Sequence, residues 1–260
     1  MSLFKTCMGK RLGQHFLTNT AIAQRIVDAA VIEPGDTVLE IGPGTGMLTQ
    51  FLVEKAKCVV AIEKDKNLVI FLKNKFKNIK HIEIVGKDIL KYKYNDIGCR
   101  YIVVANLPYY ITSRFLRLYL EKTSHKPRSM TLMIQKEVAE RICAKPPYMN
   151  LLGLSVQAFG TPKVLFRVGK GNFSPPPDVE SSVIQISNIS DEFFTKHCIS
   201  PEEFFKLPKK AFSQKRKMLR SSINAQHTVF GTKRPQELEL EEWIAIMEQN
   251  TRHQVPRTKK

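Results

Sequence analysis

The 260-residue sequence has no long apolar run, few cysteines and many more bases than acids. No stretch approaches the roughly 18 consecutive apolar residues of a transmembrane helix, which argues against a membrane span. Residues 1–17 include basic side chains but no sustained apolar core and no small-residue cleavage site. The start of the chain therefore does not match a secretory signal.

Cysteine pairs with metal-ligand spacing are also missing. The five cysteines are scattered, at positions 7, 58, 99, 143 and 198, and form no C-x-x-C motif. This pattern argues against a structural zinc site and favours a reducing compartment. His197 and Cys198 are neighbours but have no partner pair elsewhere in the chain. We therefore predict no metal site.

Acidic residues are relatively few: the chain has 24 aspartates and glutamates against 41 lysines and arginines, which gives a net charge of +17. Such an excess attracts phosphate polyanions and gains free energy from counterion release. Nucleic acid is the favoured partner. An anionic membrane surface is the alternative, but it would require a basic amphipathic helix with bulky apolar anchors.

Short β-branched runs alternate with helical windows over the first two-thirds of the chain. This alternation predicts an α/β fold with a mostly parallel sheet covered by helices, a Rossmann-like arrangement. The last two strands lack a crossover helix between them and predict an antiparallel edge. After about residue 188 the chain has only helix-like stretches, so we expect domains at 1–188 and 189–260. The predicted strands lie at 37–41, 58–63, 81–85, 101–105, 130–135, 163–168 and 181–186.

Three of these strands end in residues suited to a nucleoside. The first runs into Gly42, Gly44 and Gly46, a G-x-G-x-G loop that a ligand can approach closely. Glu63 ends the second strand, where a carboxylate can accept hydrogen bonds from ribose hydroxyls. Asp88 follows the third and can accept a hydrogen bond from an adenine amino group. Together they predict a pocket for an adenosine-bearing cofactor without phosphates, S-adenosylmethionine.

The fourth strand runs into "NLPYYIT" at residues 106–112. The Asn106 amide oxygen and the backbone carbonyls of Leu107 and Pro108 are predicted to hold the hydrogens of an exocyclic amine. The amine lone pair would then point at the methyl carbon, with catalysis arising from positioning and oriented dipoles. Tyr109 provides a face on which a purine can stack. The fourth strand tip is therefore the predicted catalytic site.

These segments together resemble the ribosomal RNA small-subunit adenine N6-dimethyltransferases, which modify two adjacent adenosines near the 3′ end of the rRNA. The matching segments span nearly the whole chain in the right order. They are "LGQHFL" (12–17), "EIGPGTGMLT" (40–49), "IEKD" (62–65), "KDIL" (87–90), "NLPYYIT" (106–112), "QKEVAERI" (135–142), "FSPPPDVESSVI" (173–184) and "AFSQKRKMLRSSI" (211–223).

The resemblance assigns roles to further residues. It implies that "GQ-x-FL" folds over the cofactor, which places His15 and Leu17 at the cofactor site. Phe173 would sandwich the target adenine against Tyr109. The implied cofactor contacts are those of His15, Leu17, Gly42, Glu63, Asp88 and Asn106. Many bacterial members have asparagine where this chain has His15, a change that can make the site sensitive to pH near 6–7.

The C-terminal stretch is the predicted RNA-binding region. It carries six cations and no acid within twelve residues: Lys209, Lys210, Lys215, Arg216, Lys217 and Arg220. Charge of one sign at this density favours a surface that follows phosphates. Apolar residues between the cations, at 212, 218, 219 and 223, predict core contacts of a basic helix. The resemblance implies the same, a small helical domain that seats rRNA.

Other functions remain open from the sequence. One is a large-subunit rRNA adenine dimethylase of antibiotic resistance, although those enzymes usually have isoleucine at the position of Leu107. Another is a non-catalytic RNA-binding assembly factor of the same fold. An oxidoreductase is disfavoured by Met47 at the third glycine position of a dinucleotide loop. We expect rRNA in a partly assembled subunit as substrate, a monomer, and the bacterial cytoplasm, with nucleolus or organelles as alternatives.

Overall fold

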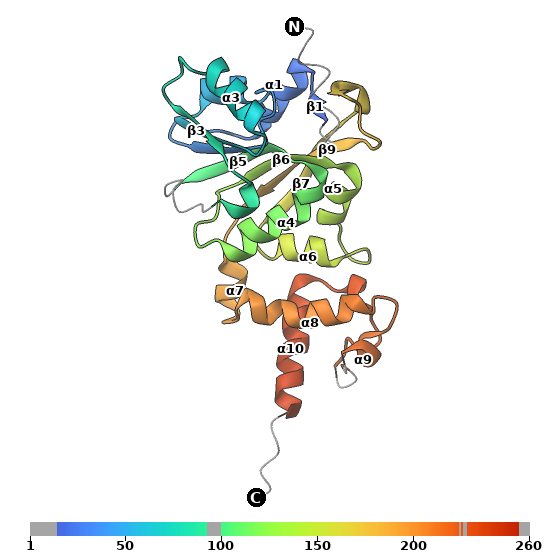
Figure 1. Ribbon diagram of the computed structural model, residues 1–260. Coiled ribbons are helices and arrows are strands. Elements are labelled where there is room, and N and C mark those ends of the chain that lie inside the picture. The colour runs from blue at the N-terminus through green and yellow to red at the C-terminus, as the bar shows by residue number, and fades with distance from the viewer. Residues whose placement is uncertain (1–14, 93–99, 224, 226–227, 255–260) are drawn as a thin grey trace, which may run out of the picture. The chain divides into compact units, whose positions relative to one another are not determined.

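The computed structural model describes residues 15–92, 100–223, 225 and 228–254 (Figure 1). Contacts divide the chain into two compact units. The first comprises 1–139 and 161–189, and the second 140–160 and 190–260. The second unit therefore includes segment 140–160, which the sequence division had placed with the first 188 residues. Each unit is described by itself below.

A seven-stranded sheet in the order β4-β3-β2-β5-β6-β9-β7 forms the centre of the first unit. The strands from β4 to β6 are parallel, while β9 runs antiparallel to both β6 and β7. The Rossmann-like sheet with an antiparallel edge is thus confirmed. The strands are β2 (Thr37–Ile41), β3 (Cys58–Glu63), β4 (Ile82–Gly86), β5 (Tyr101–Asn106), β6 (Met130–Gln135), β7 (Thr161–Val168) and β9 (Ser181–Ser187).

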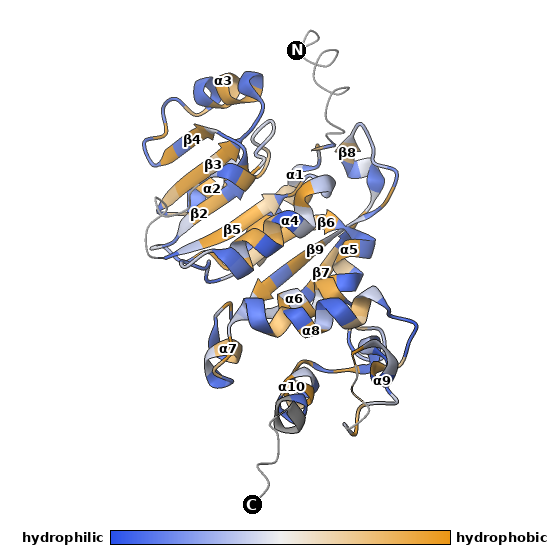
Figure 2. Ribbon diagram, turned by 60° about the horizontal axis from the view of Figure 1, so that its bottom comes forward, coloured by the Kyte–Doolittle hydropathy of each residue, from blue (hydrophilic) through white to orange (hydrophobic). Residues whose placement is uncertain are grey.

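Both faces of this sheet are buried, as expected for parallel strands with near-continuous apolar runs. Val38, Val59 and Val104 belong to one core cluster with apolar residues of the helices α1 (Thr20–Ala29) and α2 (Thr49–Lys55). Leu39 and Val60 point to the opposite face, because neighbouring strand residues alternate, and they too are buried. In Figure 2, β3 and β5 are coloured mainly as hydrophobic.

Helices connect the parallel strands, and polar caps start several of them. Asn19 caps the first, where its side chain accepts hydrogen bonds from the N–H groups of Ala21 and Ile22. Asp65 caps the third in the same way. The elements of the first unit are α1 (Thr20–Ala29), α2 (Thr49–Lys55), α3 (Lys66–Lys75), η1 (Ile89–Lys91), η3 (Tyr109–Ile111), α4 (Thr112–Arg117), η4 (Leu118–Lys122) and η5 (Lys170–Asn172).

A second, two-stranded sheet joins the start of the described chain to a distant loop. β1 (Phe16–Leu17) pairs antiparallel with β8 (Phe173–Ser174). The Thr18 N–H also donates to the Asn172 carbonyl at 2.8 Å. The segment predicted to fold over the cofactor is therefore fastened to the loop that carries Phe173. Residues 12–14 of that segment lie outside the described residues.

The described part of the second unit is helical. Helix α8 starts as the sequence predicts, with Ser200 accepting a hydrogen bond from the Glu203 N–H and proline at the first position. The helices are α6 (Leu151–Gln157), α7 (Glu192–Lys196), α8 (Pro201–Ser213), α9 (Leu219–Ser222), η6 (Pro235–Glu237) and α10 (Leu240–Gln254). Helix α5 (Lys136–Ile142) spans the sequence boundary between the units.

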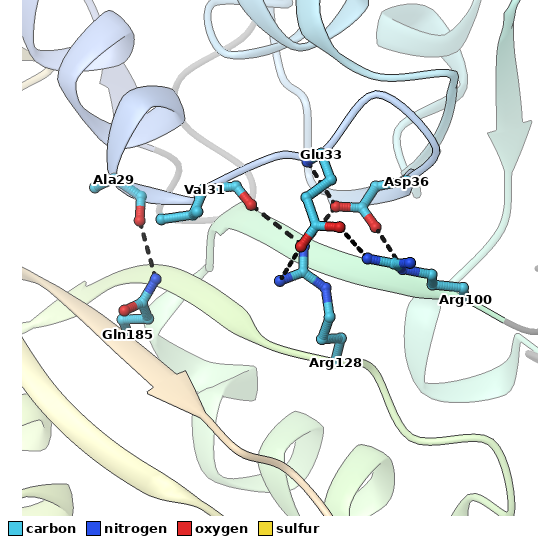
Figure 3. A network of polar contacts seen from close by, with 7 residues as sticks. All are labelled: Ala29, Val31, Glu33, Asp36, Arg100, Arg128 and Gln185. Carbon is cyan, nitrogen blue, oxygen red and sulfur yellow. Dashed lines mark hydrogen bonds and ion pairs between the residues drawn. The ribbon is translucent and has the colours of Figure 1, made fainter.

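An ionic network fixes the loop between α1 and β2 (Figure 3). Asp36, which is fully buried, pairs with Arg128 at 2.5 Å and with Arg100 at 3.2 Å. It also accepts a hydrogen bond from the Glu33 N–H at 2.8 Å. Arg128 in addition donates to the Val31 carbonyl. The network ties the end of α1 to the approaches of β5 and β6.

We expect Asp36→Asn to lower the free energy of unfolding by about 2–4 kcal/mol, because it removes the buried charge on which two guanidinium groups converge. Glu33→Gln is the matched control, since Glu33 is half exposed and should cost less than about 1 kcal/mol. Urea denaturation followed by circular dichroism measures both. Equal losses for the two variants would show that Asp36 has no special role.

Candidate active site

A cavity of about 390 Å³ opens at the carboxyl ends of β2, β3, β4 and β5. This is where open α/β sheets bind their ligands. It brings together most of the site residues predicted from the sequence. The lining residues used below are His15, Phe16, Gly42, Gly44, Glu63, Lys64, Lys87, Asp88, Ile89, Lys91, Asn106, Leu107, Pro108, Tyr109, Tyr110 and Arg114.

The glycine loop needs its glycines for two separate reasons. Gly42, Gly44 and Gly46 all have positive φ, at 65°, 60° and 79°, a region that disfavours side chains. A Cβ on Gly46 would also lie 2.8 Å from the Phe76 ring. The Lys75 ammonium donates to the Thr45 carbonyl at 2.9 Å and holds the loop. The loop therefore presents backbone to the cavity.

Glu63 lies at the end of β3, where the sequence predicts a ribose acceptor, and is 5% exposed. One carboxylate oxygen accepts hydrogen bonds from the N–H groups of Lys64 and Asp65, and the other from that of Gly44 at 3.2 Å. Burial raises the pKa of Glu63, although these three hydrogen bonds oppose the rise. The oxygen that accepts from Lys64 and Asp65 uses both of its lone pairs, whereas the oxygen that accepts from Gly44 retains one for a hydroxyl donor.

Asp88 follows β4 and is held in place from two directions. One of its oxygens caps η1 by accepting a hydrogen bond from the Leu90 N–H at 3.0 Å, and the other pairs with the Lys64 ammonium at 3.0 Å. Desolvation raises the pKa of Asp88, but the Lys64 and Leu90 hydrogen bonds outweigh it and leave the pKa lowered. The group is therefore ionised and a strong acceptor.

The "NLPYYIT" segment departs from the sequence prediction in one detail. The Pro108 carbonyl is not free, because it accepts a hydrogen bond from the Ile111 N–H at 3.1 Å and starts the turn of η3. The Leu107 N–H donates to the Met133 carbonyl on β6. Within the described residues, no group hydrogen-bonds the Asn106 side chain. Asn106 and the Leu107 carbonyl thus remain as acceptors for an amine.

Tyr109 is half-buried and oriented by its hydroxyl, which shares a 2.9 Å hydrogen bond with the Ser181 hydroxyl. Burial raises its pKa, so the ring is neutral. The ring facing it is that of His15, with centroids 6.1 Å apart and planes 27° from parallel. The His15 Nδ1 lies 2.8 Å from the Pro175 carbonyl. Because a carbonyl only accepts, Nδ1 carries the proton.

Phe173 does not lie where the resemblance placed it. It is 5% exposed, belongs to the apolar core cluster and does not line the 390 Å³ cavity. The reason is strand alternation in β8: Phe173 points inward opposite Leu17, and Ser174 points to solvent. Stacking of Phe173 on Tyr109 would require residues 172–175 to rearrange.

Leu17 and Glu40 meet at a smaller cavity of about 30 Å³ that shares Gly42, Gly44 and Asn106 with the large one. Leu17 is 4% exposed and lines this smaller cavity but not the 390 Å³ one. Glu40 was not assigned a role from the sequence, although an acid inside the apolar run "TVLEI" is a signal. Its burial raises the pKa to about 8, and one oxygen accepts a hydrogen bond from the Thr49 hydroxyl at 2.7 Å.

The six predicted RNA-binding cations are all exposed and lie in the second unit. They do not form one basic helix. Lys209 and Lys210 lie on α8, three cations occupy the turn 214–218, and Arg220 lies on α9. Of the predicted core contacts, Leu219 and Ile223 are buried and the Phe212 ring lies 6.0 Å from that of Trp243, but Met218 is 37% exposed.

Two negative findings concern the described part of the chain. No helix there is long and apolar enough to cross a membrane. No group of three or more histidine, cysteine, aspartate or glutamate side chains within those residues has the arrangement that a metal ion needs.

Comparisons with known proteins identify relatives along most of the sequence. The family model described as Ribosomal RNA adenine dimethylase matches residues 7–244. The Ribosomal RNA small subunit methyltransferase A of Dehalococcoides mccartyi is 42% identical over 217 residues, 82% of this chain and 74% of the relative. The protein of the same name from Alkaliphilus oremlandii is 38% identical over 224 residues, 83% and 77% of the two chains.

Two solved structures share the fold. A dimethyladenosine transferase from Plasmodium falciparum superposes with a TM-score of 0.79 at 25% identity, covering 92% of this chain and 98% of that one. The 23S rRNA methyltransferase ErmE superposes with a TM-score of 0.69 at 23% identity, covering 90% and 98%. The likeness to the second supports the fold alone.

Proposed function

This chain belongs to the ribosomal RNA adenine dimethylase family, and we propose that it dimethylates N6 of two adjacent adenosines near the 3′ end of small-subunit rRNA, with S-adenosylmethionine as methyl donor. The observation that carries this proposal is the cavity, which gathers an ionised acid, a buried acid, a glycine loop and a free amide acceptor at four neighbouring strand ends. The relatives named for the small subunit favour that substrate over the large subunit.

The cavity residues fit S-adenosylmethionine in size and chemistry. A volume of about 390 Å³ is in the range of small-molecule sites. Glu63 and Asp88 supply acceptors for ribose hydroxyls and the adenine amino group. The backbone of Gly42 and Gly44 lines the cavity without side chains and leaves room for the methionine part, and His15 lines the cavity beside Tyr109. When bound, the cofactor supplies an electrophilic methyl group on a sulfonium centre.

Asn106 and Leu107 hold the reacting amine. Their oxygens accept the two N6 hydrogens, which directs the nitrogen lone pair at the methyl carbon. The positive charge that would develop on nitrogen is stabilised by these two dipoles, and the electron pair of the C–S bond would remain with the sulfur of the cofactor. A proton then leaves the charged amine to water, so no dedicated base is required. Pro108 shapes the turn but contributes no free carbonyl.

Tyr109 provides one face for the flipped adenine, since enzymes that modify bases take them out of the stack. Phe173 remains a proposed second face only for a rearranged β8 loop. Such a rearrangement, which would bring Phe173 over an adenine stacked on Tyr109, would break the inward packing of Phe173 against Leu17. In the present arrangement, the His15 ring is stacked against that of Tyr109.

The proposed RNA-binding domain is residues 189–260. Segment 140–160, which groups with the second unit, is included in it. The six cations predicted from the sequence, Lys209, Lys210, Lys215, Arg216, Lys217 and Arg220, are exposed and would bind phosphates of rRNA in a partly assembled small subunit. We propose a monomeric protein of the bacterial cytoplasm, in keeping with the bacterial relatives. The alternative is a non-catalytic assembly factor of the same fold, which the free Asn106 amide beside the cofactor cavity disfavours.

Cofactor binding tests the pocket directly. We expect S-adenosylmethionine, but not NAD, to raise the melting temperature, because bound ligand stabilises the folded state. Glu63→Gln should lower the affinity for S-adenosylmethionine by about 10–100-fold, because charge-assisted hydrogen bonds to the ribose are lost. Glu83→Gln, an exposed residue on β4, is the control. Stabilisation by NAD, or equal affinity of the two variants, would contradict the assignment.

A further inference from the structure

Four exposed cations line the cavity at the end where Glu63 and Asp88 lie. Lys64 follows β3, Lys87 and Lys91 flank Asp88, and Arg114 lies on α4. The adenosine part of the proposed cofactor is neutral, and its single carboxylate belongs to the methionine part. The adenosine end of the cofactor therefore offers these cations no negative charge, and a polyanion is the ligand class that does.

Most of this charge is not neutralised within the protein. Lys64 pairs with Asp88 at 3.0 Å. For Lys87, Lys91 and Arg114, no carboxylate of a described residue lies within ion-pair distance, and the Lys87 ammonium lies 5.6 Å from the Tyr92 ring. Three cations at one edge of a cavity repel one another unless an anion lies between them. This edge is thus poised for phosphate.

Tyr110 adds an aromatic surface at the same edge. It lines the cavity yet is 59% exposed, whereas its neighbour Tyr109 is half-buried and hydrogen-bonded. Tyr110 precedes Arg114 by four residues on consecutive turns of η3 and α4, and both line the cavity together with Lys64. A large exposed ring among cations matches the pattern of single-stranded nucleic-acid sites.

We propose that Lys87, Lys91, Tyr110 and Arg114, together the basic rim, form an RNA-binding surface in the catalytic unit. Tyr110 stacks on an unpaired base next to the target adenosine, and the three cations bind the phosphates on either side. The proposal rests on the proposed function, because it presumes an rRNA substrate. It explains how adjacent adenosines are presented in turn: the neighbour of the reacting base has a site of its own.

The first test removes the charge of the rim. The variant Lys87→Gln/Lys91→Gln/Arg114→Gln is compared with Lys73→Gln/Lys77→Gln/Lys80→Gln, which removes the same charge from exposed sites that do not line the cavity. The probe is an RNA hairpin with two adjacent adenosines in its loop. We expect the slope of log affinity against log salt to fall by about 2–3 for the rim variant only. Equal slopes for the two variants would overturn the proposal.

The second test separates RNA from cofactor. The rim variant should bind S-adenosylmethionine as wild type does, and a parallel loss of cofactor affinity would assign the rim to the cofactor instead. Tyr110→Ala should lower the affinity for the hairpin by about fivefold or more. Tyr110→Phe should bind the hairpin with wild-type affinity, because stacking needs only the ring. Wild-type affinity in Tyr110→Ala would overturn the stacking. Failure of methyl transfer by wild type would refute the proposed function and leave these binding results readable.

Discussion

Asn106→Ala is expected to lower kcat for methyl transfer by about 10²–10³-fold, the usual effect of removing one preorganised dipole from a developing charge. The structure supports this size because the Asn106 amide lines the cavity with no described protein partner, so its oxygen is available for the amine alone. S-adenosylmethionine affinity should change by less than about tenfold, since Glu63 and Asp88 remain. Single-turnover transfer of a labelled methyl group measures the effect.

Ser113→Ala is the matched control for this variant, since Ser113 is exposed on α4 and does not line the cavity. It should transfer at the wild-type rate. Thermal unfolding of both variants checks that the fold is intact. If Asn106→Ala kept a wild-type kcat, Asn106 would have no role in holding the amine.

RNA affinity should fall by at least about 10³-fold between 50 and 200 mM salt from the contacts of the second unit alone, before the basic rim adds its own. Six phosphate contacts give a slope of log affinity against log salt of roughly −0.9 × 6, or about −5. With this slope, a fourfold rise in salt concentration lowers the affinity by about 10³-fold. The predicted contacts are six exposed cations of the second unit that lie on α8, on α9 and in the turn between them: Lys209, Lys210, Lys215, Arg216, Lys217 and Arg220. Fluorescence anisotropy of a labelled rRNA hairpin across this salt range measures the slope.

Charge removal in the second unit should flatten this dependence. Replacing Lys215, Arg216 and Lys217 with glutamine is expected to reduce the slope by about 2–3, one unit or slightly less for each lost contact. The control replaces Lys73, Lys77 and Lys80, which keeps the net charge equal. Affinity that is indifferent to salt in wild type would contradict electrostatic binding, and an unchanged slope in the variant would exclude this turn.

The sheet was predictable because its strands carry their own signals. The runs at 37–41, 58–63 and 130–135 match observed strands at both ends, since each is an apolar β-branched run bounded by polar or turn residues. The cavity residues were predictable because the strands were. Side chains that follow the carboxyl ends of parallel strands meet at one edge, whatever the helices do.

Long-range packing could not be predicted in the same way. The inward orientation of Phe173 depends on its pairing with Leu17, 156 residues earlier, which no local pattern encodes. Segment 140–160 groups with the second unit through contacts distant in sequence. The basic stretch breaks after Ser213 although its composition suits one helix. The sequence predicted a free Pro108 carbonyl, but this carbonyl accepts a hydrogen bond from the Ile111 N–H in a local turn.

The most direct test is methyl transfer from labelled S-adenosylmethionine to small ribosomal subunits that lack the modification, with the product mapped by mass spectrometry. The account predicts two adjacent N6,N6-dimethyladenosines near the 3′ end of the small-subunit rRNA. Transfer to large-subunit rRNA, or cofactor and RNA binding without transfer to either subunit, would contradict it.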